Sequence, residues 1–197
     1  MGIHITGVGS YIPSHKEKNQ DFLAHTFLDD SGKPFGADNG DIIEKFKAIT
    51  GIEERRYAKP HQTASDLAFL AAEKAIEDAS LDPETLDYII VAHNFGDIQH
   101  GCIQTDILPS LATRVKHNLQ IKNPNCVAYD LIFGCPGWVE GVIQAKAFIK
   151  SGMAKRCLVI GADTLSRIAD QNDRDAMIFA DGAGATIIEE TKEAGGV

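Results

Sequence analysis

The residues best suited to chemistry lie in the segment 129–138, where Cys135 stands between a predicted strand and a predicted helix. Pro136 suits the first turn of a helix, because the first N–H groups of a helix have no intrahelical partner. Cys135 is then expected to be the N-cap, with free N–H groups and the positive helix end beside its sulfur. Such an environment favours the thiolate, which is the nucleophilic form. The corner therefore predicts a nucleophilic cysteine, and the alternative is a small buried residue that fills a tight turn.

The other three cysteines indicate different environments. Cys126 and Cys157 lie in apolar segments, so we expect them in the core. Cys102 follows two histidines and an aspartate in the segment 93–102, and these residue types can bind metals. Their spacing matches no known ligand pattern, so we predict an active-site or interface loop there and no metal site. Without signs of secretion, the cysteines are expected to be reduced thiols of a cytosolic protein.

Two glycine motifs bear on cofactor binding. Gly7 and Gly9 follow the first predicted strand, but Pro13 prevents a normal helix start, so the dinucleotide fingerprint is incomplete. The segment 181–185 also lacks a third glycine, and it leads into a strand rather than a helix. We read it as a tight turn that allows close backbone approach. The sequence therefore disfavours nicotinamide and flavin binding, and we expect no cofactor.

The elements that must position Cys135 alternate between strand and helix. Apolar runs predict strands at 3–8, 86–92, 126–131, 157–160 and 183–189. Periodicity and capping signals predict helices at 41–50, 63–79, 109–119 and 135–150, with Gly51 as a stop, Thr63 and Asp66 as a capping box and Pro109 as a first residue. The alternation predicts an α/β fold, with a largely parallel sheet and helices on both faces. The helix at 135–150 is apolar on most sides, so we expect it to be covered on every side.

Composition limits the class of protein further. The 197 residues are 44% hydrophobic and 24% charged, as in ordinary globular proteins, and we assign residues 1–197 to one domain with an insertion loop at about 17–60. The net charge of −9 disfavours nonspecific binding to nucleic acid or to anionic membranes. No apolar run approaches the ~18 residues needed to span a bilayer, and the N-terminus reads as a strand rather than a signal peptide. These features predict a cytoplasmic protein.

Seven segments together resemble one enzyme family in its own order along the chain. They are 7–13, 50–56, 65–68, 86–92, 130–137, 159–167 and 179–185. The most specific surround Cys135, the Gly-Ala-Asp at 161–163 and the Asp-Gly-Ala-Gly-Ala at 181–185. On these motifs the chain resembles the N-terminal half of the β-ketoacyl-acyl-carrier-protein synthase III family, within the thiolase-like condensing enzymes.

The resemblance implies an acyl transfer. Cys135 would take an acyl group from acyl-CoA, and decarboxylative condensation with malonyl-acyl-carrier protein would then give a β-ketoacyl product. Arg174 matches the arginine near the CoA phosphates, while Leu108, Leu165 and Phe179 would line the acyl pocket or its dimer interface. The implied partners are acyl-CoA, acyl-carrier protein and a second copy of the chain in a homodimer.

Three departures from the family pattern qualify what the resemblance implies. The family needs a histidine and an asparagine from a C-terminal half, and no histidine here sits in a matching motif. Lys45 and Ile49 stand where members that use acetyl-CoA often carry a tryptophan and an arginine, and Leu108 stands where phenylalanine is common. A hydroxymethylglutaryl-CoA synthase-like acyltransferase and a non-catalytic dimerisation partner are the alternatives. A half-length chain is also expected to expose an apolar face and to oligomerise.

Overall fold

A five-stranded mixed sheet forms the centre of the molecule. The computed structural model describes residues 2–197, and the strand order is β1-β9-β8-β4-β7. The strands are β1 (Gly2–Tyr11), β4 (Tyr88–His93), β7 (Val127–Ile132), β8 (Arg156–Thr164) and β9 (Asp181–Thr191). The α/β class is confirmed. Strand β4 runs parallel to β7 and β8, but β9 runs antiparallel to both β8 and β1, so half of the pairings are antiparallel.

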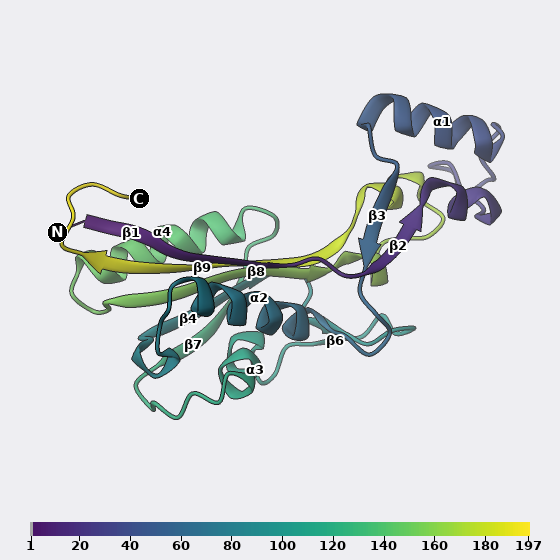
Figure 1. Ribbon diagram of the computed structural model, residues 1–197. Coiled ribbons are helices and arrows are strands. Elements are labelled where there is room, and N and C mark those ends of the chain that lie inside the picture. The colour runs from purple at the N-terminus through teal and green to yellow at the C-terminus, as the bar shows by residue number, and fades with distance from the viewer. Residues whose placement is uncertain (1) are drawn as a thin grey trace.

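Helices cover both faces of this sheet (Figure 1). Helices α2 (Ala64–Asp78) and α3 (Leu111–Asn118) bury their apolar residues against one face, and α4 (Gly137–Lys150) packs on the other. Helix α2 begins at the predicted capping box, where Thr63 N donates to Asp66 Oδ2 at 2.8 Å. Its alanine-rich face is fully buried, which lets the helix lie close to the sheet.

The two glycines of β1 serve this close packing. A Cβ built on Gly9 would lie 2.2 Å from the carbonyl oxygen of Ala71, and one on Gly7 would lie 2.3 Å from that of Ala75. Both oxygens belong to α2, so any side chain at either glycine would force the helix away from the strand. The Gly7 and Gly9 pair is therefore a contact surface for a helix.

A separate lobe projects from one end of the sheet (Figure 1). It contains β2 (His15–Lys18), the 3-10 helix η1 (Asn19–Ala24), α1 (Asn39–Thr50), β3 (Glu54–Tyr57) and the 3-10 helix η4 (Arg174–Ile178). Its own small core consists of Phe22, Phe27, Ile42, Ile43 and Met177. Helix α1 begins two residues before the predicted start and ends at Gly51, whose φ of 70° is the left-handed geometry that favours glycine. Most of the lobe comes from the stretch where we predicted an insertion loop.

The segment between β4 and α3 is more ordered than its sequence indicates. It contains a short hairpin of β5 (Asp97–Ile98) and β6 (Thr105–Asp106). The prediction that Pro109 is the first residue of the following helix is wrong: Pro109 follows a cis peptide bond, and Ser110 caps α3 by accepting from Thr113 N. The remaining short elements are the 3-10 helices η2 (Pro83–Thr85) and η3 (Leu165–Arg167).

Helix α4 is covered on one side only. Val142, Ala145 and Ile149 pack against the sheet, whereas Val139 and Ile143 are 53% and 56% exposed. The expectation that this helix is covered on every side is therefore not met within this chain, because one layer of helix lies on that face. None of the helices within residues 2–197 has the length and apolar character needed to cross a membrane.

Candidate active site

Cys135 lies in a tight corner between β7 and α4. Gly134 has a φ of +72°, which favours glycine, and its carbonyl oxygen accepts from Gly137 N at 2.9 Å. This turn uses residues 134–137, so Pro136 is the N-cap and Gly137 is the first helical residue. The prediction that Cys135 is the N-cap is therefore wrong by one position. Cys135 is exposed, which contradicts the alternative that it is a buried filler of the turn.

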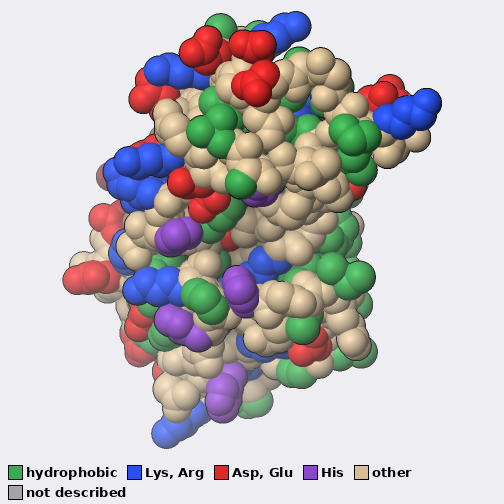
Figure 2. Space-filling model, turned by 90° about the vertical axis from the view of Figure 1, so that its right-hand side faces the viewer, with side chains coloured by type: hydrophobic (Ala, Val, Ile, Leu, Met, Phe, Trp, Pro, Cys, Tyr) green, Lys and Arg blue, Asp and Glu red, His purple; other side chains and the backbone are tan. Residues whose placement is uncertain are grey.

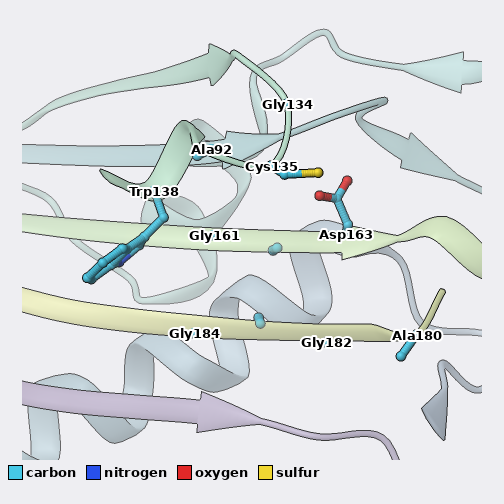
Figure 3. Close-up of a pocket in the computed structure, with 11 residues that line it drawn as sticks. Ala92, Gly134, Cys135, Trp138, Gly161, Asp163, Ala180, Gly182 and Gly184 are labelled. Carbon is cyan, nitrogen blue, oxygen red and sulfur yellow. The ribbon is translucent and has the colours of Figure 1, made fainter. Parts of the chain in front are cut away.

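The thiol opens into a cavity of about 330 Å³ at the ends of the strands. Ala92 comes from the end of β4, Gly161 and Asp163 from the end of β8, and Trp138 from the first turn of α4. Gly182 and Gly184 of β9 complete the wall (Figure 3). Ligands of α/β proteins bind outside the carboxyl ends of parallel strands, and β4 and β8 present those ends here.

Glycines on α4 and β8 bring the helix close enough to form this cavity. A Cβ on Gly137 would lie 2.9 Å from Ala92 Cβ, and one on Gly141 would lie 2.7 Å from Val159 Cγ1. A Cβ on Gly161 would come to 3.4 Å from Trp138 Cβ. Because these positions carry no side chain, α4, which begins two residues after Cys135, can pack closely against β4 and β8.

Asp163 is the charged group on the opposite wall. Its carboxylate rises from β8 toward the sulfur of Cys135 (Figure 3). Its Oδ1 accepts from Asn94 N at 2.9 Å, and its Oδ2 accepts from Asn94 Nδ2 at 2.6 Å. Burial raises the pKa of Asp163, while the two bonds from Asn94 oppose that rise. Asp163 ends the Gly-Ala-Asp motif at 161–163, but the local sequence predicts no role for it, because nothing there shows that it faces the cysteine.

A buried network fixes the strand that leads to Cys135. Gly96 N donates to Nδ1 of His93, so Nε2 of His93 carries the proton and donates to Asp130 Oδ2 at 3.1 Å. Asp130 also accepts from the backbone N–H groups of Leu111 and Ala112 at 2.7 and 2.8 Å. Asp130 thus ties β7 to the N-terminus of α3 and to the turn after β4. Within residues 2–197, no three side chains of metal-binding type gather in one cluster.

The remaining predicted site residues lie outside this cavity. Arg174 lines a second cavity of about 470 Å³ in the lobe, together with Lys45 and Ile49. Its guanidinium lies 4.6 Å from the ring centroid of Phe35. The three predicted acyl-pocket residues, Leu108, Leu165 and Phe179, are absent from the lining of the Cys135 cavity, and Leu108 is 81% exposed.

Cys126 and Cys157 are both buried, as predicted. Burial raises the pKa of the Cys157 thiol to about 12, and it also raises the pKa of the Cys126 thiol. These two thiols are therefore poor nucleophiles. Cys102 is exposed, but it lies in the hairpin segment after β5 and not in the cavity.

An α/β layer with an exposed cysteine at the corner between a strand and a glycine-bearing helix defines a thiolase-like half. Residues 129–197 match the family described as 3-oxoacyl-[acyl-carrier-protein] synthase III. The β-ketoacyl-[acyl-carrier-protein] synthase III of Neisseria gonorrhoeae is 39% identical over 192 residues, which cover 97% of this chain and 53% of that protein. The enzyme of the same name from Staphylococcus haemolyticus is 37% identical over 198 residues, with 56% of its length covered.

The solved structures agree with the sequence matches. The crystal structure of 3-oxoacyl-[acyl-carrier-protein] synthase III from Aquifex aeolicus superposes with a TM-score of 0.78 at 32% identity, over 98% of this chain and 55% of that one. The chain is therefore similar, in sequence and in fold, to the 3-oxoacyl-[acyl-carrier-protein] synthase III family. It spans about half the length of the curated relatives it matches, and it corresponds to their N-terminal half.

Proposed function

We propose that this chain carries the nucleophile of an acyl transfer and that Cys135 accepts an acyl group from acyl-CoA. The thiolate of Cys135 attacks the thioester carbonyl carbon, a new C–S bond forms, and the C–S bond to CoA breaks. CoA leaves as a thiol after taking up the proton that Cys135 released. The observation that carries this proposal is the exposed thiol at a strand–helix corner that opens into a cavity. The names of the relatives support it.

The lobe cavity supports binding of the CoA nucleotide. Arg174 offers a guanidinium for phosphate oxygens, and Lys45 adds a second cation at the same cavity. Phe35 and Phe46 give aromatic faces on which an adenine can lie. The position of Arg174 thus supports the CoA contact that the resemblance implies, with Lys45 and Ile49 in place of the family's common tryptophan and arginine.

We propose that the complete reaction is the decarboxylative condensation with malonyl-acyl-carrier protein. That step requires groups that stabilise a carbanion and a thioester oxyanion, and no histidine lines the Cys135 cavity within residues 2–197. This chain alone is therefore expected to acylate without condensing. In the complete site, Leu108, Leu165 and Phe179 are proposed to shape the acyl pocket, with Leu108 reaching it from a partner copy.

The surface bears on the proposed protein partners. On the face in Figure 2, acidic and basic side chains are interspersed over the lobe and histidines lie below it, so this face has no uniform basic patch for an acidic carrier protein. The exposed Val139 and Ile143 of α4 form an apolar stripe one helical turn apart. The exposure of this stripe supports an oligomeric protein, in which a partner would bury it. We propose a homodimer of cytoplasmic enzyme chains, each built on one thiolase-like domain.

Intact-protein and peptide mass spectrometry with a panel of acyl-CoAs tests the proposal. We expect one acyl adduct on Cys135 and none on Cys126 or Cys157. Cys135→Ser should remove the adduct. Cys102→Ala is the matched control, since it removes the other exposed thiol and should leave acylation within about twofold. Absence of any adduct on Cys135 with every donor would refute the proposal.

A further inference from the structure

A buried carboxylate stands where the lobe joins the sheet. Asp181, at the start of β9, is only 4% exposed. Its Oδ2 accepts from Ala58 N at 2.7 Å and from Ser166 Oγ at 2.7 Å, while its Oδ1 accepts from Ser166 N at 3.0 Å. One side chain thus holds three donors from two distant segments of the chain.

These segments belong to the connections between the lobe and the sheet. The chain enters the lobe after β1, returns after β3 through Ala58, and passes through the lobe again between β8 and β9. Ser166 lies at the beginning of that last connection and Asp181 at its end. Arg167 braces the same junction by donating Nη2 to the carbonyl oxygen of Lys59 at 2.9 Å.

Apolar packing contributes little to holding the lobe in place. The lobe core forms its own cluster, and none of its residues belongs to the two clusters that hold the helices on the sheet. Figure 1 shows the lobe extending from the end of the sheet, to which the connecting strands join it. The polar contacts around Asp181 are therefore among the contacts that tie the lobe to the sheet.

The orientation of the lobe matters because the two candidate binding cavities lie on opposite sides of the junction. Arg174 and Met177 line the lobe cavity, and Ala180 and Gly182 line the Cys135 cavity. One continuous segment, 174–182, thus runs from one cavity to the other. Asp181 lies between Ala180 and Gly182, and its side chain bonds to the connections instead of lining the cavity.

We propose that Asp181 is a positioning residue that fixes the distance and angle between the lobe cavity and the Cys135 thiol. The inference rests on the proposed function, since it assumes that one acyl-CoA molecule occupies both cavities. Asp181 then contributes to the binding of donors that carry the nucleotide. It contributes nothing to the binding of donors that reach only the thiol.

Asp181→Asn tests this with little change in shape. Asp181 accepts an amide N–H on each oxygen, and an asparagine NH₂ group can accept from neither Ala58 nor Ser166. The variant therefore loses at least one of the two hydrogen bonds that backbone N–H groups donate to the side chain at position 181. Ser166→Ala is a milder second variant, because it removes only the hydroxyl bond. Asp87→Asn is a control for the loss of charge: Oδ2 of Asp87 accepts the backbone N–H groups of Lys155 and Arg156 in the sheet body, and the asparagine oxygen can keep both bonds.

The measurement is the rate of Cys135 acylation by mass spectrometry as a function of donor concentration. Two donors are compared: an acyl-CoA and the same acyl group on N-acetylcysteamine, which lacks the nucleotide. For Asp181→Asn we expect the half-saturating acyl-CoA concentration to rise about tenfold, equivalent to ~1.4 kcal/mol. The rate with the short thioester should stay within about twofold, as should both rates for Asp87→Asn. Ser166→Ala should shift the acyl-CoA value in the same direction by about threefold.

The outcomes separate the two proposals. If the wild type is acylated by neither donor, the proposed function fails. If the wild type is acylated by both donors and Asp181→Asn slows both equally, or slows neither, the positioning role of Asp181 is wrong. Thermal unfolding of each variant shows whether it folds, and Ser166→Ala decides the question if Asp181→Asn does not.

Discussion

The contact between α4 and β8 at Gly141 offers a quantitative test of how the cysteine corner is held. Gly141 lies inside α4, and a Cβ there would stand 2.7 Å from Cγ1 of the fully buried Val159 and 3.6 Å from Cγ2 of Ile90. Val159 is β-branched and lies in a central strand, so it can hardly rotate away. Gly141→Ala must therefore push the helix outward or strain the strand.

The expected magnitudes follow from opposing terms. Replacing glycine by alanine inside a helix gains about 1 kcal/mol in helix propensity. Overpacking of the core costs about 2–3 kcal/mol, so the net destabilisation by Gly141→Ala is about 1–2 kcal/mol. Val159→Ala alone removes two buried carbon atoms and costs about 2.5 kcal/mol, including the cavity that it leaves.

The double variant provides the decisive comparison. In Gly141→Ala/Val159→Ala, the new methyl group occupies the space that Cγ1 vacates. The two variants should therefore be coupled, and the double variant should be more stable than the sum of the single effects by about 2–3 kcal/mol, which is the overpacking cost that it relieves. Urea unfolding of the wild type and the three variants gives this coupling energy.

Thiol alkylation gives a second measurement on the same variants. Cys135 should react with iodoacetamide at a changed rate in Gly141→Ala and at a rate nearer to the wild-type value in the double variant, because the helix returns toward the sheet. Additivity of the stability effects within about 0.5 kcal/mol would refute the close contact, as would a Gly141→Ala variant more stable than the wild type.

Two further predictions concern the core. Gly9→Ala should lower the free energy of unfolding, measured with urea, by more than ~3 kcal/mol, because its Cβ would meet the backbone of α2 at Ala71. Gly36→Ala is the control, since a Cβ there meets nothing within 4 Å. Its free energy of unfolding should stay within ~0.5 kcal/mol of the wild-type value. Buried Cys157 has a pKa of about 12 against an ordinary 9.0, so the unfolded chain binds fewer protons between these values and stability falls as pH rises through that window. The stability advantage of the wild type over Cys157→Ala should therefore shrink by about 2 kcal/mol between pH 8.5 and 10.5, and an unchanged gap in unfolding at the two pH values would contradict the burial of that thiol.

Short-range signals predicted the helices with the greatest success. The capping box at Thr63 and the glycine stop at Gly51 both act within one helical turn, and the structure has both where the sequence places them. The same holds for Cys126 and Cys157, whose apolar neighbours already indicate burial. Pro109 shows the limit of such signals, because a proline suits several positions near a helix start and the capping geometry of Ser110 decided between them.

Local sequence patterns are enough to predict the α/β alternation, the helix boundaries within a few residues and the corner that presents Cys135. The folded chain was needed to show that β9 runs antiparallel, that Gly7 and Gly9 pack against α2, and that Asp163 faces the thiol. Periodicity and caps arise from neighbours along the chain, so they can be read locally. Strand pairing and the meeting of side chains from β4, β8, β9 and α4 depend on how distant segments share one sheet, and no local pattern encodes that arrangement.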